Sequence, residues 1–343
     1  MHIKHKVKPP VFTCMMTIIS FVLLGCEHEN ALDSNQNQPK EITWQQTALD
    51  SLKIVTLAAN STGTVFAGTC GDGIFRSKDL GTTWTRVNNY RAKTIAINAD
   101  ADIFAAIVFG GLIRSTDNGE SWTLLNVDVG LSFNFVSIAF NKFGKIFVGS
   151  SVSDESRGGI YRSIDKGDTW MQTSFPDSLS ALVLAINANG VIFVGTFFGV
   201  FRFTDDGETW TQSNSGFRER GVGPFVASLA INPLTGDIFA GVIFDKVYRS
   251  EDNGNTWNPT DLTSPNIGTL VINSAGDIFA GSGGYSMDPQ GVFYSTDNGK
   301  SWSKINRGLT NTYIRTLTVD SSGFVFAGTQ GNGVFRTVNS TMQ

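Results

Sequence analysis

One eight-residue phrase recurs along the chain and constrains the fold more than any other feature of the sequence. It has the form Ser-x-Asp-x-Gly-x-Thr/Ser-Trp, and Phe203 replaces the first serine in one copy. The six copies occupy residues 77–84, 115–122, 163–170, 203–210, 250–257 and 295–302. Successive tryptophans lie 38, 48, 40, 47 and 45 residues apart. Such a period is typical of arrays in which each repeat buries its apolar faces against its neighbours.

The residues around each phrase predict four strands per repeat. An alternating run such as 92–98 ends in a turn rich in Asn, Asp and Gly, which indicates a strand and a tight turn. A short apolar run follows, such as 65–68, and its continuous apolarity indicates a strand covered on both faces. A third strand such as 74–77 runs into the phrase, and a fourth begins at the tryptophan. We therefore expect the four-stranded blades of a β-propeller.

The two ends of the chain complete each other. Residues 315–319, 325–328 and 334–336 supply three strands, and no further phrase follows them. The missing fourth strand is present at the other end, around Trp44 in residues 42–47. Joining the two ends would leave no loose edge between the first and last blades. The predicted fold is all-β: a single seven-bladed propeller over residues 41–343, closed by one N-terminal strand beside three C-terminal strands.

Residues 1–40 differ in composition from the rest of the chain. A basic start precedes an apolar stretch, 11–24, which is too short to span a bilayer permanently. This pattern predicts a secretory signal over residues 1–25. The polar residues that follow predict a disordered tether over 26–40. Leu-Leu-Gly-Cys at 23–26 resembles the lipobox of bacterial lipoproteins, which implies lipidation of Cys26 and a lipid-anchored protein of the bacterial cell envelope, periplasmic or surface-facing. The alternative is an ordinary cleaved signal.

Composition excludes several classes of function. The leader carries three lysines and no acid, so its removal changes the net charge from −4 to about −7, and nucleic acid is a poor partner. Cys14 leaves with the leader and Cys26 would carry lipid, so Cys70 has no disulfide partner. All three histidines precede residue 41, which removes the base of a catalytic triad and most zinc sites. We expect no metal and no cofactor.

The repeated phrase resembles the Asp-box, or bacterial neuraminidase (BNR) repeat. That repeat occurs in sialidases, sortilin-type receptors, xyloglucan-degrading glycosidases and photosystem II assembly factors. The resemblance covers residues 41–340 and implies a propeller. These families share the blade and differ in chemistry, so the resemblance does not choose an activity.

The recurring polar residues have a structural interpretation. An aspartate in a tight turn can accept hydrogen bonds from the turn's own amides, the glycine supplies a positive φ, and the tryptophan fills the gap between sheets. A residue needed in every blade is needed by the blade. We therefore expect structural turn roles for Asp79, Asp117, Asp165, Asp205, Asp252 and Asp297. Arginines also recur in register, which favours an ion pair at the strand end or a hydrogen bond to a turn.

Residues that do not repeat are the candidates for binding. If the Asp turns lie on one face of the disc, the loops between second and third strands and the connections between blades lie on the other. Exposed aromatics beside arginines on such loops suit recognition of a protein segment or a glycan. The predicted binding residues are Tyr90, Arg91, Phe133, Phe198, Phe217, Arg218, Arg220, Tyr285 and Tyr313.

Two classes of function follow. The first is a lipid-anchored, non-catalytic propeller that binds or assembles a protein or peptide in the bacterial envelope, as the resemblance to sortilin-like and assembly-factor propellers implies. The alternative is a carbohydrate-active protein, either a glycoside hydrolase of sialidase-like type or a glycan-binding lipoprotein. A glycosidase would draw its two carboxyl groups from Asp128, Asp154, Glu155, Asp177, Asp245 and Asp288. The Arg-Ile-Pro signature of sialidases is absent and a single ring is present, so we assign no catalytic residue.

Overall fold

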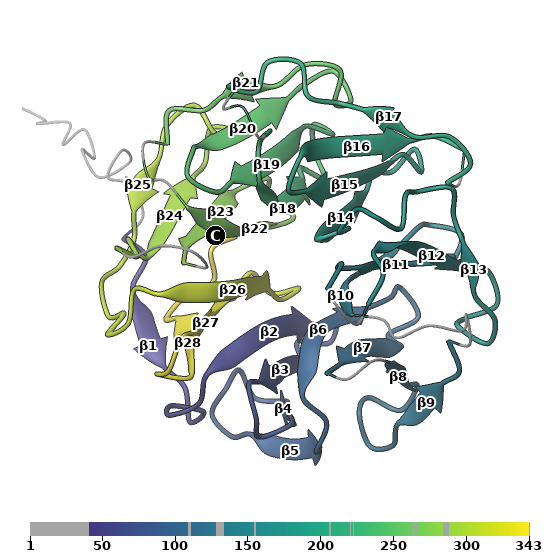
Figure 1. Cartoon of the computed structure of the whole chain (residues 1–343). Helices are drawn as coiled ribbons and strands as arrows, with labels where there is room; N and C mark the ends of the chain where they lie inside the picture. The colour runs from purple at the N-terminus through teal and green to yellow at the C-terminus, as the bar shows by residue number, and fades with distance from the viewer. Residues whose placement is uncertain are drawn as a thin grey trace, which may run out of the picture. The chain divides into compact units, whose positions relative to one another are not determined.

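A computed structural model shows a ring of seven four-stranded antiparallel sheets (Figure 1). It describes residues 41–108, 111–127, 134–153, 156–205, 207–219, 221, 223–262, 264, 266–283 and 288–342. Each sheet is one blade, and its first strand lies nearest the centre of the ring. The expected seven-bladed propeller is confirmed.

The strands follow one another within each blade in chain order. Blade 1 contains β2 (Ile54–Ala59), β3 (Val65–Thr69), β4 (Ile74–Ser77) and β5 (Thr85–Asn88). Blade 2 contains β6 (Ala92–Ile97), β7 (Ile103–Ile107), β8 (Leu112–Ser115) and β9 (Thr123–Leu125). Blade 3 contains β10 (Phe135–Phe140), β11 (Ile146–Ser150), β12 (Gly159–Ser163) and β13 (Met171–Gln172). Blade 4 contains β14 (Val183–Ile186), β15 (Ile192–Thr196), β16 (Gly199–Phe203) and β17 (Thr211–Gln212).

The remaining blades repeat this order until the ring closes. Blade 5 contains β18 (Val226–Ile231), β19 (Ile238–Val242), β20 (Val247–Ser250) and β21 (Asn258–Pro259). Blade 6 contains β22 (Ile267–Ile272), β23 (Ile278–Ser282), β24 (Val292–Ser295) and β25 (Ser303–Lys304). Blade 7 contains β26 (Ile314–Val319), β27 (Val325–Thr329), β28 (Val334–Thr337) and β1 (Trp44–Gln46).

Blade 7 is the closing blade that the sequence predicts. β1 pairs antiparallel with β28, so that Trp44 lies opposite Thr337 and Gln46 lies opposite Phe335. The indole of Trp44 donates a hydrogen bond to the carbonyl of Ile305 in blade 6, at 2.6 Å. Residues from the two ends of the folded ring therefore complete one sheet, which removes the free edge that β28 would otherwise present.

The core is divided into seven apolar clusters, each between two consecutive blades. The second strand of every blade is buried along its whole length, as its continuous apolarity predicts. Each second strand carries a fully buried phenylalanine, and the tryptophan of the next blade packs into the same cluster. Phe193 and Trp257 are one such pair, and the indole of Trp257 donates to the carbonyl of Ser213 at 2.8 Å.

The antiparallel blades give the ring two different faces. The turns between first and second strands lie on the same face as the Asp-box turns, and the two sets touch across blades. The amide of Asn60 in blade 1 donates to Asn118 in blade 2, and Asn187 in blade 4 donates to Asn253 in blade 5. We call this side the turn face. The loops between second and third strands and the connections between blades form the opposite side, the loop face.

Candidate functional site

The carboxylate of each described Asp-box turn is engaged within its own turn. Asp79 accepts hydrogen bonds from the Ser77 hydroxyl at 2.8 Å, the Thr83 amide at 2.9 Å and the Thr83 hydroxyl at 2.6 Å. The same bonds recur at Asp117, Asp165, Asp252 and Asp297. Asp205 accepts from Thr209 and from the Glu208 amide, and it lacks the serine bond because Phe203 has no hydroxyl. The turn itself therefore accounts for these aspartates, and no ligand is needed to explain them.

These hydrogen bonds favour the charged carboxylate. Those from Ser121 are the main reason that the pKa of Asp117 is lowered to about 2, and those from Thr169 lower the pKa of Asp165 to about 2. A carboxyl group that stays ionised at all physiological pH values is poorly suited to donate or accept a proton during catalysis.

The recurring arginines join the turns of consecutive blades. Arg76 in blade 1 donates to the carbonyl of Asn118 in blade 2 at 2.7 Å, and Arg114 donates in the same way to Lys166. Blade 6 carries Tyr294 where the other blades carry arginine. Its neighbour, blade 7, has no Asp-box turn to receive an arginine, and the Tyr294 hydroxyl donates to Asp277 instead.

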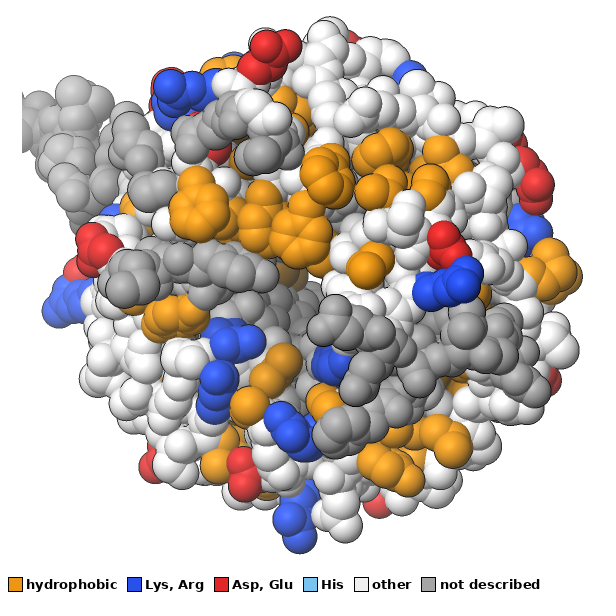
Figure 2. Space-filling view, viewed as in Figure 1, with side chains coloured by type: hydrophobic (Ala, Val, Ile, Leu, Met, Phe, Trp, Pro, Cys, Tyr) orange, Lys and Arg blue, Asp and Glu red, His pale blue; other side chains and the backbone are white. Residues whose placement is uncertain are grey.

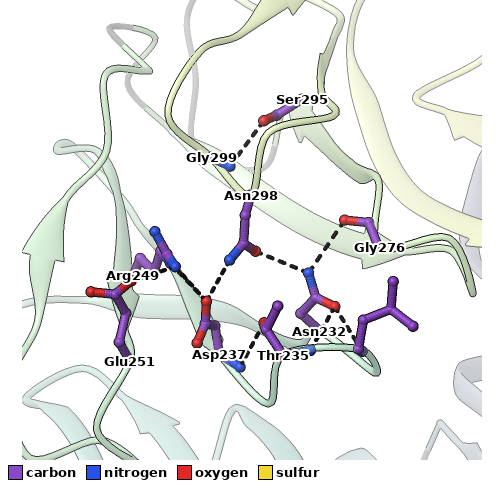
Figure 3. Close-up of polar contacts among 10 residues, drawn as sticks. Asn232, Thr235, Asp237, Arg249, Glu251, Gly276, Ser295, Asn298 and Gly299 are labelled. Carbon is purple, nitrogen blue, oxygen red and sulfur yellow. Dashed lines mark hydrogen bonds and ion pairs between the residues drawn. The ribbon is translucent and has the colours of Figure 1, made fainter.

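At the boundary between blades 5 and 6, the arginine forms ion pairs within its own blade, and a residue of blade 6 bonds to one of the partner carboxylates (Figure 3). Arg249 contacts the buried carboxylate of Asp237 at 2.6 Å and also pairs with Glu251. The amide of Asn298, from the Asp-box turn of blade 6, donates to Asp237 and accepts from Asn232. Both roles that the sequence suggests for these arginines therefore occur, and the recurring residues of the turn face serve contacts between blades.

The loop face carries an apolar groove between blades 4 and 5, which we call the loop-face groove. It has a volume of about 560 Å³. Three phenylalanine rings in its lining are exposed: Phe197 by 40%, Phe198 by 50% and Phe244 by 57%. The remaining lining residues are Arg218, Gly223, Pro224, Phe225, Val242, Ile243 and Asp245. A cluster of exposed rings of this kind marks a binding surface more often than scattered single residues do.

Hydrogen bonds fix the loops that carry these rings. The amide of Phe198 donates to the Thr196 hydroxyl at 2.9 Å, and its carbonyl accepts from Asn214 at 2.8 Å. The amide of Phe244 donates to the side chain of Asn266 at 2.9 Å. Because the backbone is held on both sides of the groove, the exposed rings are already in place before any partner binds.

A more polar hollow of about 510 Å³ adjoins the groove. The two share Arg218, Gly223 and Pro224, and the hollow is also lined by Asn214, Ser215, Gly216, Phe217, Glu219 and Gly221. The arginine therefore stands between an apolar and a polar recess. Asp245, also in the groove lining, accepts a hydrogen bond from the Tyr248 hydroxyl at 3.1 Å, and that hydroxyl accepts one from the Arg218 amide at 3.3 Å.

The structure brings two of the predicted binding residues together and separates the others. Phe198 and Arg218 line the groove. Tyr90 and Arg91 lie on the connection between blades 1 and 2, where Tyr90 is exposed, and Tyr313 is half-buried between blades 6 and 7. Phe133, Arg220 and Tyr285 lie outside the described residues, as does Cys26.

Phe217 requires a correction, because its ring is buried rather than exposed. It stacks on Trp257 with ring centroids 5.0 Å apart and meets Tyr248 edge-on at 4.8 Å. Phe217 therefore belongs to the core between blades 4 and 5. The groove instead uses Phe197, Phe225 and Phe244, which the sequence argument did not select. The adjacent pair of phenylalanines at 197–198, unique among the loops between second and third strands, was the available signal.

The loop carboxylates proposed for a glycosidase are dispersed. Asp177 pairs with Arg157 at 2.7 Å beside blade 3, Asp245 lies in the groove, and Asp288 accepts from Gln290 in blade 6 at 2.6 Å. Asp128, Asp154 and Glu155 lie outside the described residues. Within the described part of the chain, no group of three or more His, Cys, Asp or Glu side chains could hold a metal ion. No helix in that part is long and apolar enough to cross a membrane.

The repeat places the chain in a recognisable class. The BNR/Asp-box repeat family matches residues 293–304, which hold the sixth copy of the phrase. Together with the ring and its turns, this match defines a seven-bladed β-propeller with BNR/Asp-box repeats. No curated protein matches the sequence.

Solved propellers of several kinds share the fold. The extracellular domain of the putative one component system BT4673 from B. thetaiotaomicron superposes with a TM-score of 0.71 at 14% identity, covering 89% of this chain and 40% of that one. The chain thus spans less than half of that solved domain. YCF48 bound to D1 peptide gives 0.67 at 16% identity, covering 88% and 98%. The GH74 xyloglucanase from Xanthomonas campestris gives 0.66 at 15% identity, covering 88% and 54%. Both a peptide-binding propeller and a glycoside hydrolase are therefore similar in fold.

Proposed function

We propose that this protein is a non-catalytic propeller that binds a polypeptide segment in the loop-face groove. The observation that carries the proposal is the set of three exposed phenylalanines, Phe197, Phe198 and Phe244, on loops held by hydrogen bonds. Exposing such rings to water is unfavourable, and burying them under a partner would recover about 25 cal/mol for each Å² of apolar surface. The YCF48 structure supports the proposal, because a propeller of similar fold is bound to a peptide in it.

The chemistry of the groove indicates what the segment would carry. A volume of about 560 Å³ falls in the range of ligand pockets and accepts bulky apolar side chains. Arg218 and Asp245 in the lining supply a cation and a carboxylate that can bond to backbone or polar groups of the segment. Aromatic anchors with a few polar groups around them are the usual composition of a binding hot spot.

The proposal includes the location of the protein. We infer a lipid on Cys26 and a place in the bacterial cell envelope, with residues 27–40 as a tether that holds the ring away from the membrane. The basic start, the apolar stretch and the Leu-Leu-Gly-Cys sequence support this inference.

Selection of peptides on the folded protein tests the proposed function. Peptides selected from a random display library on the full ring should bind wild type, and Phe198→Ser and Phe244→Ser should each weaken them by about tenfold or more, as for a hot-spot residue. Phe143→Ser is the matched control, because Phe143 is 73% exposed but lies in a first-to-second-strand turn on the turn face. Failure to select any peptide, or equal weakening by the control, would contradict the proposal.

A glycan ligand remains the second candidate, because a polar hollow that contains Arg218 and Glu219 adjoins the aromatic rings. Aromatic rings beside such polar groups also suit a sugar. A glycan array and assays with polysaccharides, carried out on the same variants and on Glu219→Gln and Asp245→Asn, distinguish the two. Glycan binding that is lost in Phe198→Ser, or turnover that is lost in the carboxylate variants, would replace the peptide by a carbohydrate.

A further inference from the structure

The first strands of all seven blades surround a cavity of about 250 Å³ at the centre of the ring. One position of each first strand faces its neighbours around this cavity. Five of the seven are apolar or glycine, as at Val55, Val136 and Gly268, and the other two are Lys93 and Arg315. No carboxylate occurs in this lining, all of which is described. The centre of an acidic protein therefore contains two positive charges without an opposite charge beside them.

Arg315 has more hydrogen-bond donors than the surrounding protein offers acceptors. Its Nη1 donates to the side chain of Gln330 at 2.6 Å, while its Nε is buried and has no hydrogen-bond partner. A guanidinium offers five N–H donors, and a buried donor of a charged group that finds no acceptor is strongly unfavourable. The protein therefore satisfies this guanidinium incompletely at the edge of the cavity that it lines.

Lys93 lacks a compensating charge in the same cavity. Its ammonium donates to the side chain of Asn134, a neutral group in blade 3. Burial lowers the pKa of Lys93, and the positive charge of Arg91 lowers it further. Among the described residues, neither Lys93 nor Arg315 forms an ion pair.

Lys93 and Arg315 come from β6 and β26, the first strands of the two blades that flank blade 1. Figure 2 shows Lys and Arg side chains over the half of this face that contains β2 and β6, while hydrophobic side chains gather over the opposite half. Liquid water occupies about 30 Å³ per molecule, so the cavity has room for a small oxyanion together with several waters.

We propose that the central channel is an oxyanion site, in which Lys93 and Arg315 bind a phosphate or carboxylate group. The two side chains supply positive charges of the kind that bind such anionic groups, and the guanidinium can contact two oxygens at once. The group can belong to a free small anion or to the terminus of a polypeptide. The site is separate from the loop-face groove, so it does not depend on the proposed function.

Titration with inorganic phosphate at constant ionic strength tests the site. Calorimetry on the full ring should show saturable binding to wild type, and thermal unfolding should shift upward with phosphate because only the folded state offers the site. Arg315→Gln and Lys93→Met should each raise the dissociation constant by about tenfold or more, as expected for loss of one charge-assisted hydrogen bond. Lys93→Arg should retain binding.

Two cations away from the cavity provide matched controls. Arg307→Gln removes an exposed arginine that pairs with Glu41, and Lys142→Met removes a lysine of the turn face. Both should bind phosphate as wild type does, and Phe198→Ser should too. Circular dichroism establishes that each variant is folded, and if Arg315→Gln does not fold, the two Lys93 variants decide.

Further probes identify the source of the anion. Succinate represents a free carboxylate. Trialanine with a free C-terminal carboxylate represents a peptide terminus, and the same peptide with an amidated C-terminus is its control. Binding of phosphate or succinate supports a free anion, and binding of the free-acid peptide alone supports a terminus. No saturable binding of any of these probes, or equal losses in the channel and control variants, would overturn the oxyanion site.

Discussion

Arg76 in blade 1 donates a hydrogen bond to the main-chain carbonyl of Asn118 in blade 2, at 2.7 Å. The same guanidinium meets Glu120 at 2.7 Å, and Arg76 is buried while Glu120 is exposed. The carbonyl belongs to an Asp-box turn, so one blade satisfies a polar group of the next. This contact shows how a residue that recurs in nearly every blade can be charged and still serve only the assembly of the ring.

Replacing Arg76 by methionine should destabilise the protein by about 1 to 3 kcal/mol, because the Asn118 carbonyl loses its partner in a buried contact. Arg86→Met is the control, since Arg86 is exposed on β5. Urea denaturation of both variants measures the difference in unfolding free energy. An equal and small effect of the two substitutions would mean that the bond contributes nothing to the ring.

Gly119 is required for two physical reasons. Its φ is +84°, and a Cβ at this position would lie 2.9 Å from the ring of Phe66 in the preceding blade. Gly119→Ala should therefore cost about 2 to 4 kcal/mol, from backbone strain together with overpacking. Gly144→Ala has a similar φ of +78° and open space around the added Cβ, so it should cost only the strain, about 1 kcal/mol. Thermal denaturation that ranks the two variants in the opposite order would contradict the packing argument.

The Asp-box turns should make stability depend on acid pH. The pKa of Asp165 is lowered from 3.8 to about 2, chiefly by the hydroxyl of Thr169. A carboxyl whose pKa is lower in the folded state stabilises that state above its unfolded pKa, and this contribution is lost as the pH falls from about 4 to about 2. Asp165→Asn should thus unfold more readily than wild type at pH 7.

Urea denaturation at a series of pH values measures this dependence. The difference between wild type and Asp165→Asn should be constant from pH 7 to pH 5 and should shrink below pH 4. Asp50→Asn, at an exposed position outside any turn phrase, should show no such trend. A difference that stays the same down to pH 2 would mean that the charge of Asp165 is not the stabilising feature.

Much of the fold could be predicted from the sequence because the same strand and turn pattern recurs in each blade, so each copy supports the assignment of the others. The four strands, the seven blades and the closing role of Trp44 all follow from short local patterns. The groove could not be predicted in the same way. Phe198 and Phe244 are on loops of different blades, and only the packing of those blades brings them to one recess.

Phe217 also shows that local sequence does not predict contacts between blades. Its neighbours in sequence are polar or glycine, and they predict an exposed loop. The ring is buried because Tyr248 and Trp257, both in blade 5, meet it across the blade boundary. Likewise, the sequence left two roles open for the arginines, and the structure shows both: Arg76 donates to a carbonyl of the next blade, whereas Arg249 pairs with a carboxylate of its own blade.

The proposed anchor gives a prediction for residues outside the described part of the chain. Wild type expressed with its leader in a bacterium should partition into the detergent phase, and mass spectrometry should find a lipidated Cys26 at the new N-terminus. Cys26→Ser should remain in the aqueous phase, and Cys70→Ser should behave as wild type. Identical partitioning of wild type and Cys26→Ser would exclude the lipid anchor.

The division of the ring into a turn face that maintains the fold and a loop face that binds is tested most directly by hydrogen exchange with a selected peptide. The peptide should slow exchange at residues 197–198, 223–225 and 242–245, which line the loop-face groove, because binding reduces local opening there. The Asp-box turns around Asp79, Asp165 and Asp252 should exchange as in the free protein. Protection of those turns, with none at the groove, would contradict the account.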